Sequence, residues 1–128
     1  MVDKIIAVDF DGTVVTHEYP DVGNDVPYAV EVLKRLDANG VKIILWTMRH
    51  GAALQDAVDW YAKKGIPLFG VNENPQQIEW TQSPKCYAQV YVDDAAIGCP
   101  VKHPMSGKGR PFVDWQAVEK LLQEKMFC

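Results

Sequence analysis

The chain has 128 residues and a mass of 14.4 kDa, the usual size of one domain, so we expect a single domain over residues 1–128. Hydrophobic residues make up 48% of the chain and charged residues 23%, a mixture that excludes a disordered protein. The net charge of −4 gives no bulk attraction for nucleic acid, and no apolar run approaches the roughly 18 residues of a membrane span.

The start of the chain and its cysteines bear on the cellular compartment. Acidic residues interrupt the apolar stretch within 1–12 and no small-residue cleavage site follows, so we expect no signal peptide there. The three cysteines, Cys86, Cys99 and Cys128, are odd in number and lack metal-ligand spacing. These features predict reduced thiols in a cytoplasmic protein.

The first half of the chain predicts strands and helices in alternation. Residues 4–8 form a short run rich in β-branched residues, which predicts a buried strand. Residues 14–26 are polar and predict a loop with room for a small hairpin. A helix is predicted from Pro27, which suits a first helical position, to a stop at Gly40. Residues 41–46 predict a second buried strand.

The second half continues the alternation. The same signals predict, in order, a helix at 52–64, a weaker strand at 66–71, a loop at 72–84, a strand at 88–92 and a long irregular loop at 98–111. Gly65 caps the helix before it, and Asp114 is the predicted N-cap of a last helix.

The predicted strands are near-continuous apolar runs without a period of two. This pattern predicts an α/β fold in which helices cover both faces of a parallel sheet. Ligands of such sheets bind at the carboxyl ends of the strands. The residues that follow each strand are therefore the candidates for chemistry.

Acidic and hydroxyl side chains follow three of the predicted strands. In chain order they are Asp9 and Asp11, then Thr47, then Asp93 and Asp94, with Lys85 just before the last strand. Without these four aspartates the chain has 13 acidic and 13 basic residues, so the whole net charge would lie at one edge of the sheet. Four crowded carboxylates do not all stay ionised without a cation. An oxygen-only site with few ligands suits Mg²⁺.

The spacing of Asp9 and Asp11 has a chemical reason. Residues two apart at a strand end point the same way, so one carboxylate can attack while the other moves protons. Gly12 lets the backbone turn and approach a ligand, and Thr13 can hydrogen-bond and fix that turn. Taken alone, an Asp-Gly-Thr sequence is also typical of an ordinary turn after a strand.

The joint pattern resembles the haloacid dehalogenase-like hydrolase superfamily. The resemblance spans residues 4–98 and rests on residues 9–13 after an apolar strand, Thr47 after the second strand, Lys85, and residues 91–94 at the end of a later strand. It implies a doubly wound, Rossmann-like sheet that binds Mg²⁺ at the strand ends. It also implies a phosphatase that works through an aspartyl-phosphate.

The resemblance assigns a role to each matching position. It implies that Asp9 is the nucleophile. Asp11 would protonate the leaving group and then activate water. Thr47 and Lys85 would bind the phosphoryl oxygens and neutralise their charge. The metal ligands would be the Asp9 carboxylate, the backbone carbonyl of Asp11, and one of Asp93 and Asp94 directly with the other through water; we favour Asp94 as the direct ligand.

Other residues carry weaker predictions. Arg49 forms a Thr-x-Arg pattern like that of some relatives and is a candidate for binding substrate phosphate, although a solvated arginine is an equal alternative. Thr47 has the alternative of a helix cap, and Lys85 that of a surface lysine. His17 and His50 are candidates at the pocket edge, with a solvated loop position as the simpler interpretation. A basic rim for a polyanionic substrate is predicted at Lys102, His103, Lys108 and Arg110.

The segments at which this superfamily inserts cap domains are short here. Residues 14–26 and 72–84 are too few to fold into a lid, so we predict an open site that favours bulky substrates or a lid from a second subunit. The substrate stays open between a small molecule and a polynucleotide or protein phosphate. The alternatives are a non-catalytic phosphate-binding or assembly protein on the same fold and a phosphorylatable receiver domain, which needs its aspartate at the end of a middle strand.

Overall fold

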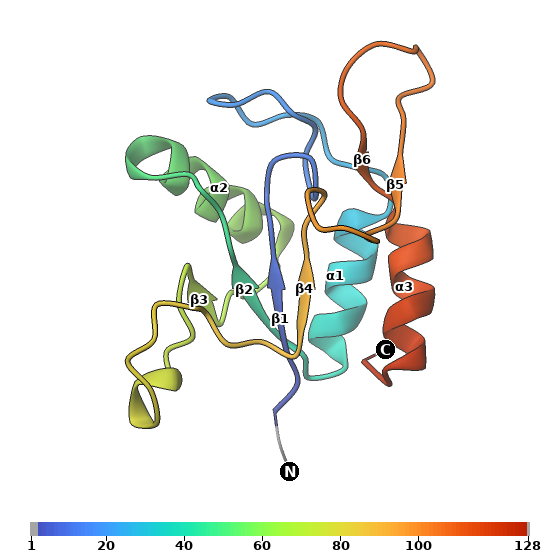
Figure 1. Cartoon of the computed structure of the whole chain (residues 1–128). Coiled ribbons are helices and arrows are strands. Elements are labelled where there is room, and N and C mark those ends of the chain that lie inside the picture. Colours follow the sequence, from blue (N-terminus) through green and yellow to red (C-terminus); the bar gives the residue numbers. More distant parts are fainter. Residues whose placement is uncertain (1–2, 128) are drawn as a thin grey trace.

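The fold is α/β and is built on a four-stranded parallel sheet, as the sequence predicts. The structure is a computed structural model that describes residues 3–127. The strands are β1 (Ile5–Val8), β2 (Lys42–Leu45), β3 (Gly70–Val71) and β4 (Val90–Val92). Their order across the sheet is β3-β2-β1-β4, so β1 lies in the interior with β2 on one side and β4 on the other (Figure 1).

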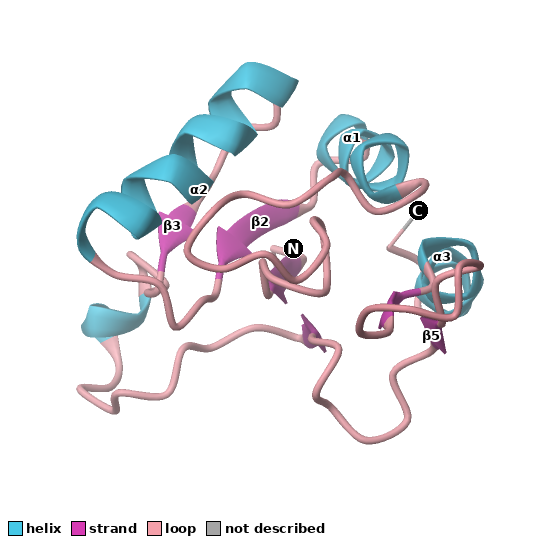
Figure 2. Cartoon of the chain, turned by 90° about the horizontal axis from the view of Figure 1, so that it is seen from above, coloured by secondary structure: helices cyan, strands magenta, loops and turns pink. Residues whose placement is uncertain are grey.

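Three helices pack into one apolar cluster on one face of this sheet. They are α1 (Ala29–Ala38), α2 (Gly51–Lys64) and α3 (Trp115–Glu124). Alternate strand residues such as Ile6, Val8 and Ile43 contact buried residues of all three helices. Viewed along the sheet, the helices lie on one side and the segment that leads to β4 runs along the other (Figure 2). The three α-helices of residues 3–127 therefore lie on one face, and the other face carries only the short helix described below.

The other face of the sheet is covered by the irregular segment 72–89. Cys86 and Ala88 of this segment pack against Ile5, Ala7 and Ile44 in a second, smaller core cluster. The segment contains one short 3-10 helix, η1 (Gln77–Glu79).

The side chain of Gln77 holds the segment 72–89 together. Its amide nitrogen donates to the carbonyls of Ser83 and Lys85, and its oxygen accepts the N–H of Tyr87. Asn74 adds a donor to the carbonyl of Tyr87. These amides provide the hydrogen bonds that a helix would have supplied from its own backbone.

Several boundaries differ from the prediction. α1 begins at Ala29, because Tyr28 adopts a φ of 68° that does not continue a helix, so Pro27 is not its first residue. The third strand is reduced to Gly70–Val71. The predicted hairpin in 14–26 is present as a bridge between Val15 and Asp25.

The segment 98–111 is not wholly irregular, contrary to the prediction. Its residues Val101–Lys102 form β5, which pairs antiparallel with β6 (Phe112–Val113), because Val101 lies opposite Val113 where the two ends of the loop meet. Asp114 is the N-cap of α3, as predicted, and its carboxylate accepts the N–H of Ala117.

Two further findings concern the compartment. No helix within residues 3–127 is both long enough and apolar enough to cross a bilayer. Cys86 and Cys99 are free thiols, and Cys128 lies outside the described residues.

Candidate active site

Three of the four predicted aspartates meet at one end of the sheet. Asp9 follows β1, and Asp93 and Asp94 follow the neighbouring strand β4. One carboxylate oxygen from each of the three lies within 4.8 Å of the others. All three side chains are half-buried. This carboxylate cluster, Asp9, Asp93 and Asp94, consists of hard oxygen donors that suit Mg²⁺.

Burial and neighbouring carboxylates strongly raise the pKa of Asp9. Burial, the charge of Asp93 and a hydrogen bond with Asp94 together raise the pKa of Asp9 from 3.8 to about 8. The main-chain N–H of Phe10 and the Thr13 hydroxyl oppose this rise. Without a cation, Asp9 therefore keeps its proton to a much higher pH than an ordinary aspartate. A divalent cation at the cluster would offset the burial and the repulsion by stabilising the ionised carboxylates, so the residues present fit such an ion.

Thr13 is a buried support of the cluster. It has no exposed surface. Its hydroxyl donates to Oδ2 of Asp9 at 3.0 Å and accepts the main-chain N–H of Asp94 at 3.3 Å. The carbonyl of Thr13 accepts the indole N–H of Trp115, which anchors this turn to α3. The sequence predicts that Thr13 fixes this turn, and its buried hydroxyl also orients Asp9.

His17 contacts the cluster from the segment 14–26. Its Nε2 lies 2.9 Å from Oδ2 of Asp94. Gly12, at a φ of 79°, leaves space for this pair, since a Cβ atom there would lie 2.0 Å from Nε2 of His17 and 2.5 Å from Oδ2 of Asp94. The glycine of the predicted motif is therefore required by this contact as well as by the turn.

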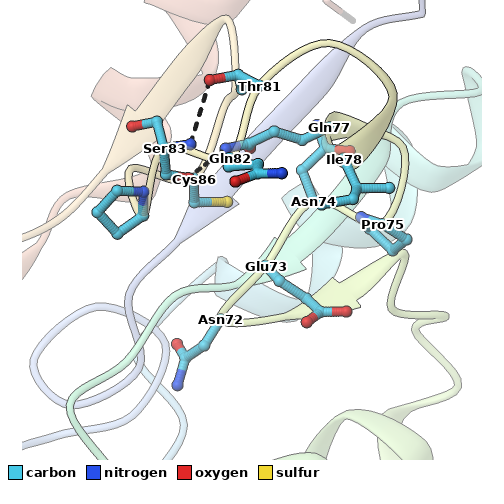
Figure 3. Close-up of a pocket in the computed structure, with 11 residues that line it drawn as sticks. Asn72, Glu73, Asn74, Pro75, Gln77, Ile78, Thr81, Gln82, Ser83 and Cys86 are labelled. Atoms are coloured by element: carbon cyan, nitrogen blue, oxygen red, sulfur yellow. Dashed lines mark hydrogen bonds between the residues drawn. The ribbon is translucent and has the colours of Figure 1, made fainter.

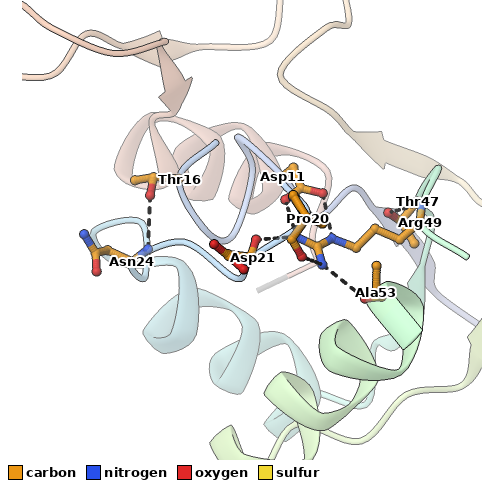
Figure 4. Close-up of polar contacts among 8 residues, drawn as sticks. All are labelled: Asp11, Thr16, Pro20, Asp21, Asn24, Thr47, Arg49 and Ala53. Carbon is orange, nitrogen blue, oxygen red and sulfur yellow. Dashed lines mark hydrogen bonds and ion pairs between the residues drawn. The ribbon is translucent and has the colours of Figure 1, made fainter. Parts of the chain in front are cut away.

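Asp11 is not part of the cluster, because Arg49 holds it. Nε and Nη2 of Arg49 donate to the two carboxylate oxygens of Asp11 at 2.9 and 2.8 Å. The remaining N–H groups of Arg49 donate to the carbonyls of Pro20, Asp21 and Ala53 (Figure 4). Arg49 is only 2% exposed. With all five donors engaged, Arg49 is a structural partner of Asp11 in this structure and not a free group for a substrate phosphate.

Thr47 lies at the same edge of the sheet, next to a residue that the sequence analysis did not single out. The N–H of Thr47 donates to Oδ1 of Asn72 at 2.7 Å, and its hydroxyl accepts the N–H of Arg49. Asn72 follows β3 and has a φ of 55°. Its position, directly after a predicted strand, was the signal that could have found it.

Lys85 does not contact the carboxylate cluster. Within residues 3–127 no hydrogen bond or ion pair joins Lys85 to Asp9, Asp93 or Asp94. Its Nζ lies 5.8 Å from the centre of the Tyr91 ring, and the side chain is exposed.

A hollow of about 640 Å³ lies beside the segment that carries Lys85, and Asn72, Glu73 and Cys86 are among its lining residues (Figure 3). None of the clustered aspartates lines it. The buried amides of Asn74 and Gln77 in its wall are engaged in the hydrogen bonds of their own segment. This hollow is consequently a poor candidate for the reaction site.

Comparison with known proteins gives one informative similarity. No family model matches the chain, and no curated protein matches it. A solved structure described as that of a conserved protein from Bacteroides thetaiotaomicron superposes with a TM-score of 0.78. The two sequences are 34% identical over 97% of this chain and 93% of that chain. The fold and most of the chain length are therefore shared.

Proposed function

The chain belongs to the same family as the conserved Bacteroides thetaiotaomicron protein, and we propose that it is a Mg²⁺-dependent phosphomonoester hydrolase of the haloacid dehalogenase-like type. The observation that carries the proposal is the carboxylate cluster at the carboxyl ends of two adjacent parallel strands. We also infer that the sheet is a Rossmann-like one, which the parallel order β3-β2-β1-β4 supports. The free thiols Cys86 and Cys99 are consistent with a cytoplasmic location.

The proposed reaction has two steps at Asp9. A carboxylate oxygen of Asp9 attacks phosphorus, and the bond between phosphorus and the leaving oxygen breaks while Asp11 donates a proton to that oxygen. For this step one oxygen of Asp11 must leave Arg49 and carry the proton, since both oxygens accept from Arg49 in this structure. Water then attacks the aspartyl-phosphate as Asp11 takes its proton, and inorganic phosphate leaves. Bound Mg²⁺ supplies charge neutralisation for the phosphoryl oxygens and keeps Asp9 ionised.

The surrounding residues hold these groups in place. Thr13 fixes one oxygen of Asp9, which leaves the other for attack. Arg49 fixes the orientation of Asp11 through a two-point contact. The hydroxyl of Thr47 is the proposed phosphate donor, since Thr47 follows β2 at the same end of the sheet as Asp9 and Asn72 holds its backbone there. Lys85 reaches the phosphate in this proposal only by moving from Tyr91.

A direct test is the hydrolysis of an aryl phosphate. Activity should vanish in chelator and return with Mg²⁺. Asp9→Asn should abolish both turnover and an acid-stable phosphoenzyme, because an amide is not a nucleophile. Asp37→Asn, on the exposed face of α1, is the matched control and should retain wild-type turnover. Full activity in chelator, or turnover of Asp9→Asn within tenfold of wild type after deamidation is excluded, would contradict the proposal.

The placement of Lys85 favours one second candidate, a phosphate-binding protein without turnover. The Lys85 ammonium group, which would stabilise a transferring phosphoryl group, has no contact with the cluster in this structure. Such a protein would bind phosphate in the presence of Mg²⁺ but form no phosphoenzyme. The same experiment therefore separates the two functions.

A further inference from the structure

His17 is the only histidine among the described residues that contacts the carboxylate cluster. It lies in the segment 14–26, far in sequence from its partner Asp94. Both side chains are only 15% exposed, so the contact is shielded from water. An ionised carboxylate can only accept a hydrogen bond, so Nε2 of His17 carries the hydrogen and donates it.

The surroundings of Asp94 show why this contact matters. Thr13 holds the main chain of Asp94 through its N–H but does not hold the carboxylate. The carboxyl group is hydrogen-bonded to His17 and to Asp9, and a carboxylate oxygen of Asp93 lies within 4.8 Å of it. Asp9 is a like-charged group and repels Asp94 when both are ionised. His17 is thus the hydrogen-bond donor that fixes the Asp94 side chain.

The backbone limits movement of the pair. Gly12 packs so closely that any side chain there would overlap both Nε2 of His17 and Oδ2 of Asp94. Arg49 ties the same segment down further along, at the carbonyls of Pro20 and Asp21. The position of His17 is therefore limited by the close packing at Gly12 before it and by the contacts of Arg49 after it in the chain.

We propose that His17 is a positioning residue for the metal site: its N–H holds the Asp94 carboxylate in the orientation that binds the cation. This inference rests on the proposed function, because it assumes a divalent cation at Asp9, Asp93 and Asp94. Hydrogen-bond partners of metal ligands typically change metal affinity by about 10- to 100-fold when removed. The effect of His17 belongs to cation binding and not to the chemical step.

The test measures binding of Mn²⁺ to the whole chain by the electron paramagnetic resonance signal of the free ion. His17→Ala should bind Mn²⁺ about 10- to 100-fold more weakly than wild type. His17→Gln, which keeps a side-chain N–H, should recover most of the affinity. His50→Ala removes an exposed histidine and should match wild type. In phosphatase assays His17→Ala should need more Mg²⁺, with a nearly unchanged kcat once Mg²⁺ saturates.

The possible results distinguish failure of the role of His17 from failure of the proposed function. Thermal unfolding confirms that the variants fold, and His17→Leu replaces His17→Ala if the latter does not. Mn²⁺ affinity of the variant within twofold of wild type, while Asp94→Asn loses binding, would overturn the role of His17 and leave the proposed function standing. Equal losses in His17→Gln and His17→Ala would overturn the role of the N–H. A wild-type chain that binds no Mn²⁺ would remove the proposed function itself.

Discussion

Arg49 stabilises the site because one buried guanidinium joins three parts of the chain. It pairs with Asp11 and donates to carbonyls of the segment 14–26 and of the first turn of α2. The neighbouring carboxylate also raises the pKa of Arg49, so the side chain stays charged. Arg49 lies against the ring of Phe10 at 4.9 Å, which adds a cation–π contact.

Removal of the Arg49 guanidinium should lower the stability of the fold. We expect Arg49→Met to lower the free energy of unfolding by about 3 kcal/mol, because it leaves Asp11 and three carbonyls without their donor. Urea unfolding measures the change. Arg110→Met, at an exposed position, should change it by less than about 0.5 kcal/mol. Equal stability of the two variants would show that the Arg49 contacts do not stabilise the fold.

The raised pKa of Asp9 predicts a pH dependence of stability in the absence of metal. An acid whose pKa is higher in the folded state, here about 8 against 3.8, binds a proton more tightly when folded. Its contribution to stability is therefore complete below pH 4 and is lost as the pH rises toward 8. In chelator, wild type should lose stability relative to Asp9→Asn between pH 5 and pH 8. Urea unfolding of both proteins measures this difference.

Addition of Mg²⁺ provides the control for the pH prediction. The cation should restore the stability of wild type at pH 8, because it replaces the proton at the cluster. Asp9→Asn should respond less. A difference between the two proteins that is constant with pH in chelator would contradict the raised pKa of Asp9.

At the scale of elements, the segment 72–89 depends on side-chain amides. Gln77→Ala should lower the free energy of unfolding by about 1–3 kcal/mol, because the N–H of Tyr87 and two carbonyls lose their partner. Opening of the segment should also expose Cys86, which is 2% exposed and whose thiol pKa is raised by burial. We expect faster alkylation of Cys86, read by mass spectrometry of the labelled peptide. Gln82→Ala is the exposed control, and equal alkylation rates in both variants would contradict this role of Gln77.

Elements with a strong local pattern were predictable from the sequence. The apolar runs predicted β1 and β2, and Asp114 and Gly65 marked helix ends at the positions where the structure has them. The cover of the second sheet face was not predictable. It consists of a segment held by Gln77, whose hydrogen bonds to backbone groups six to ten residues away leave no periodic trace in the sequence.

The residues of the site likewise divide into some that could be predicted from the sequence and some that could not. Asp9, Asp93 and Asp94 could be predicted to meet, because parallel strands bring their carboxyl ends to one edge. The partners of these groups could not, since they depend on how the loops fold back. From the sequence, the simpler interpretation of His17 was a solvated loop residue, and Arg49 was equally a phosphate-binding candidate or a solvated arginine. Tertiary contacts instead place His17 against Asp94 and Arg49 against Asp11.

At the scale of the whole molecule, charge is unevenly arranged about the site. The segments 14–26 and 98–111 both stand at the end of the sheet where the strands finish, whereas η1 lies toward the other end (Figure 1). The segment 98–111, which contains β5 and the loop after it, carries the exposed residues Lys102, Lys108 and Arg110. With Lys85 placed away from the cluster, we expect this loop to supply positive charge for a substrate larger than its phosphate.

The last prediction concerns this basic loop. Joint replacement of Lys102, Lys108 and Arg110 by glutamine should lower kcat/KM for a phosphorylated oligonucleotide about tenfold, since three exposed contacts of roughly 0.5 kcal/mol each sum to that factor. Hydrolysis of a small aryl phosphate should change less than about twofold, because it does not extend to the loop. The same charge change at Lys34 of α1, Lys120 of α3 and Lys125, which directly follows α3, is the control. Added salt should reduce the difference between the substrates by screening the loop. Equal losses on both substrates would instead place the loop charges at the phosphate itself, and the absence of any loss would leave a bulky polyanion without a binding surface on this loop.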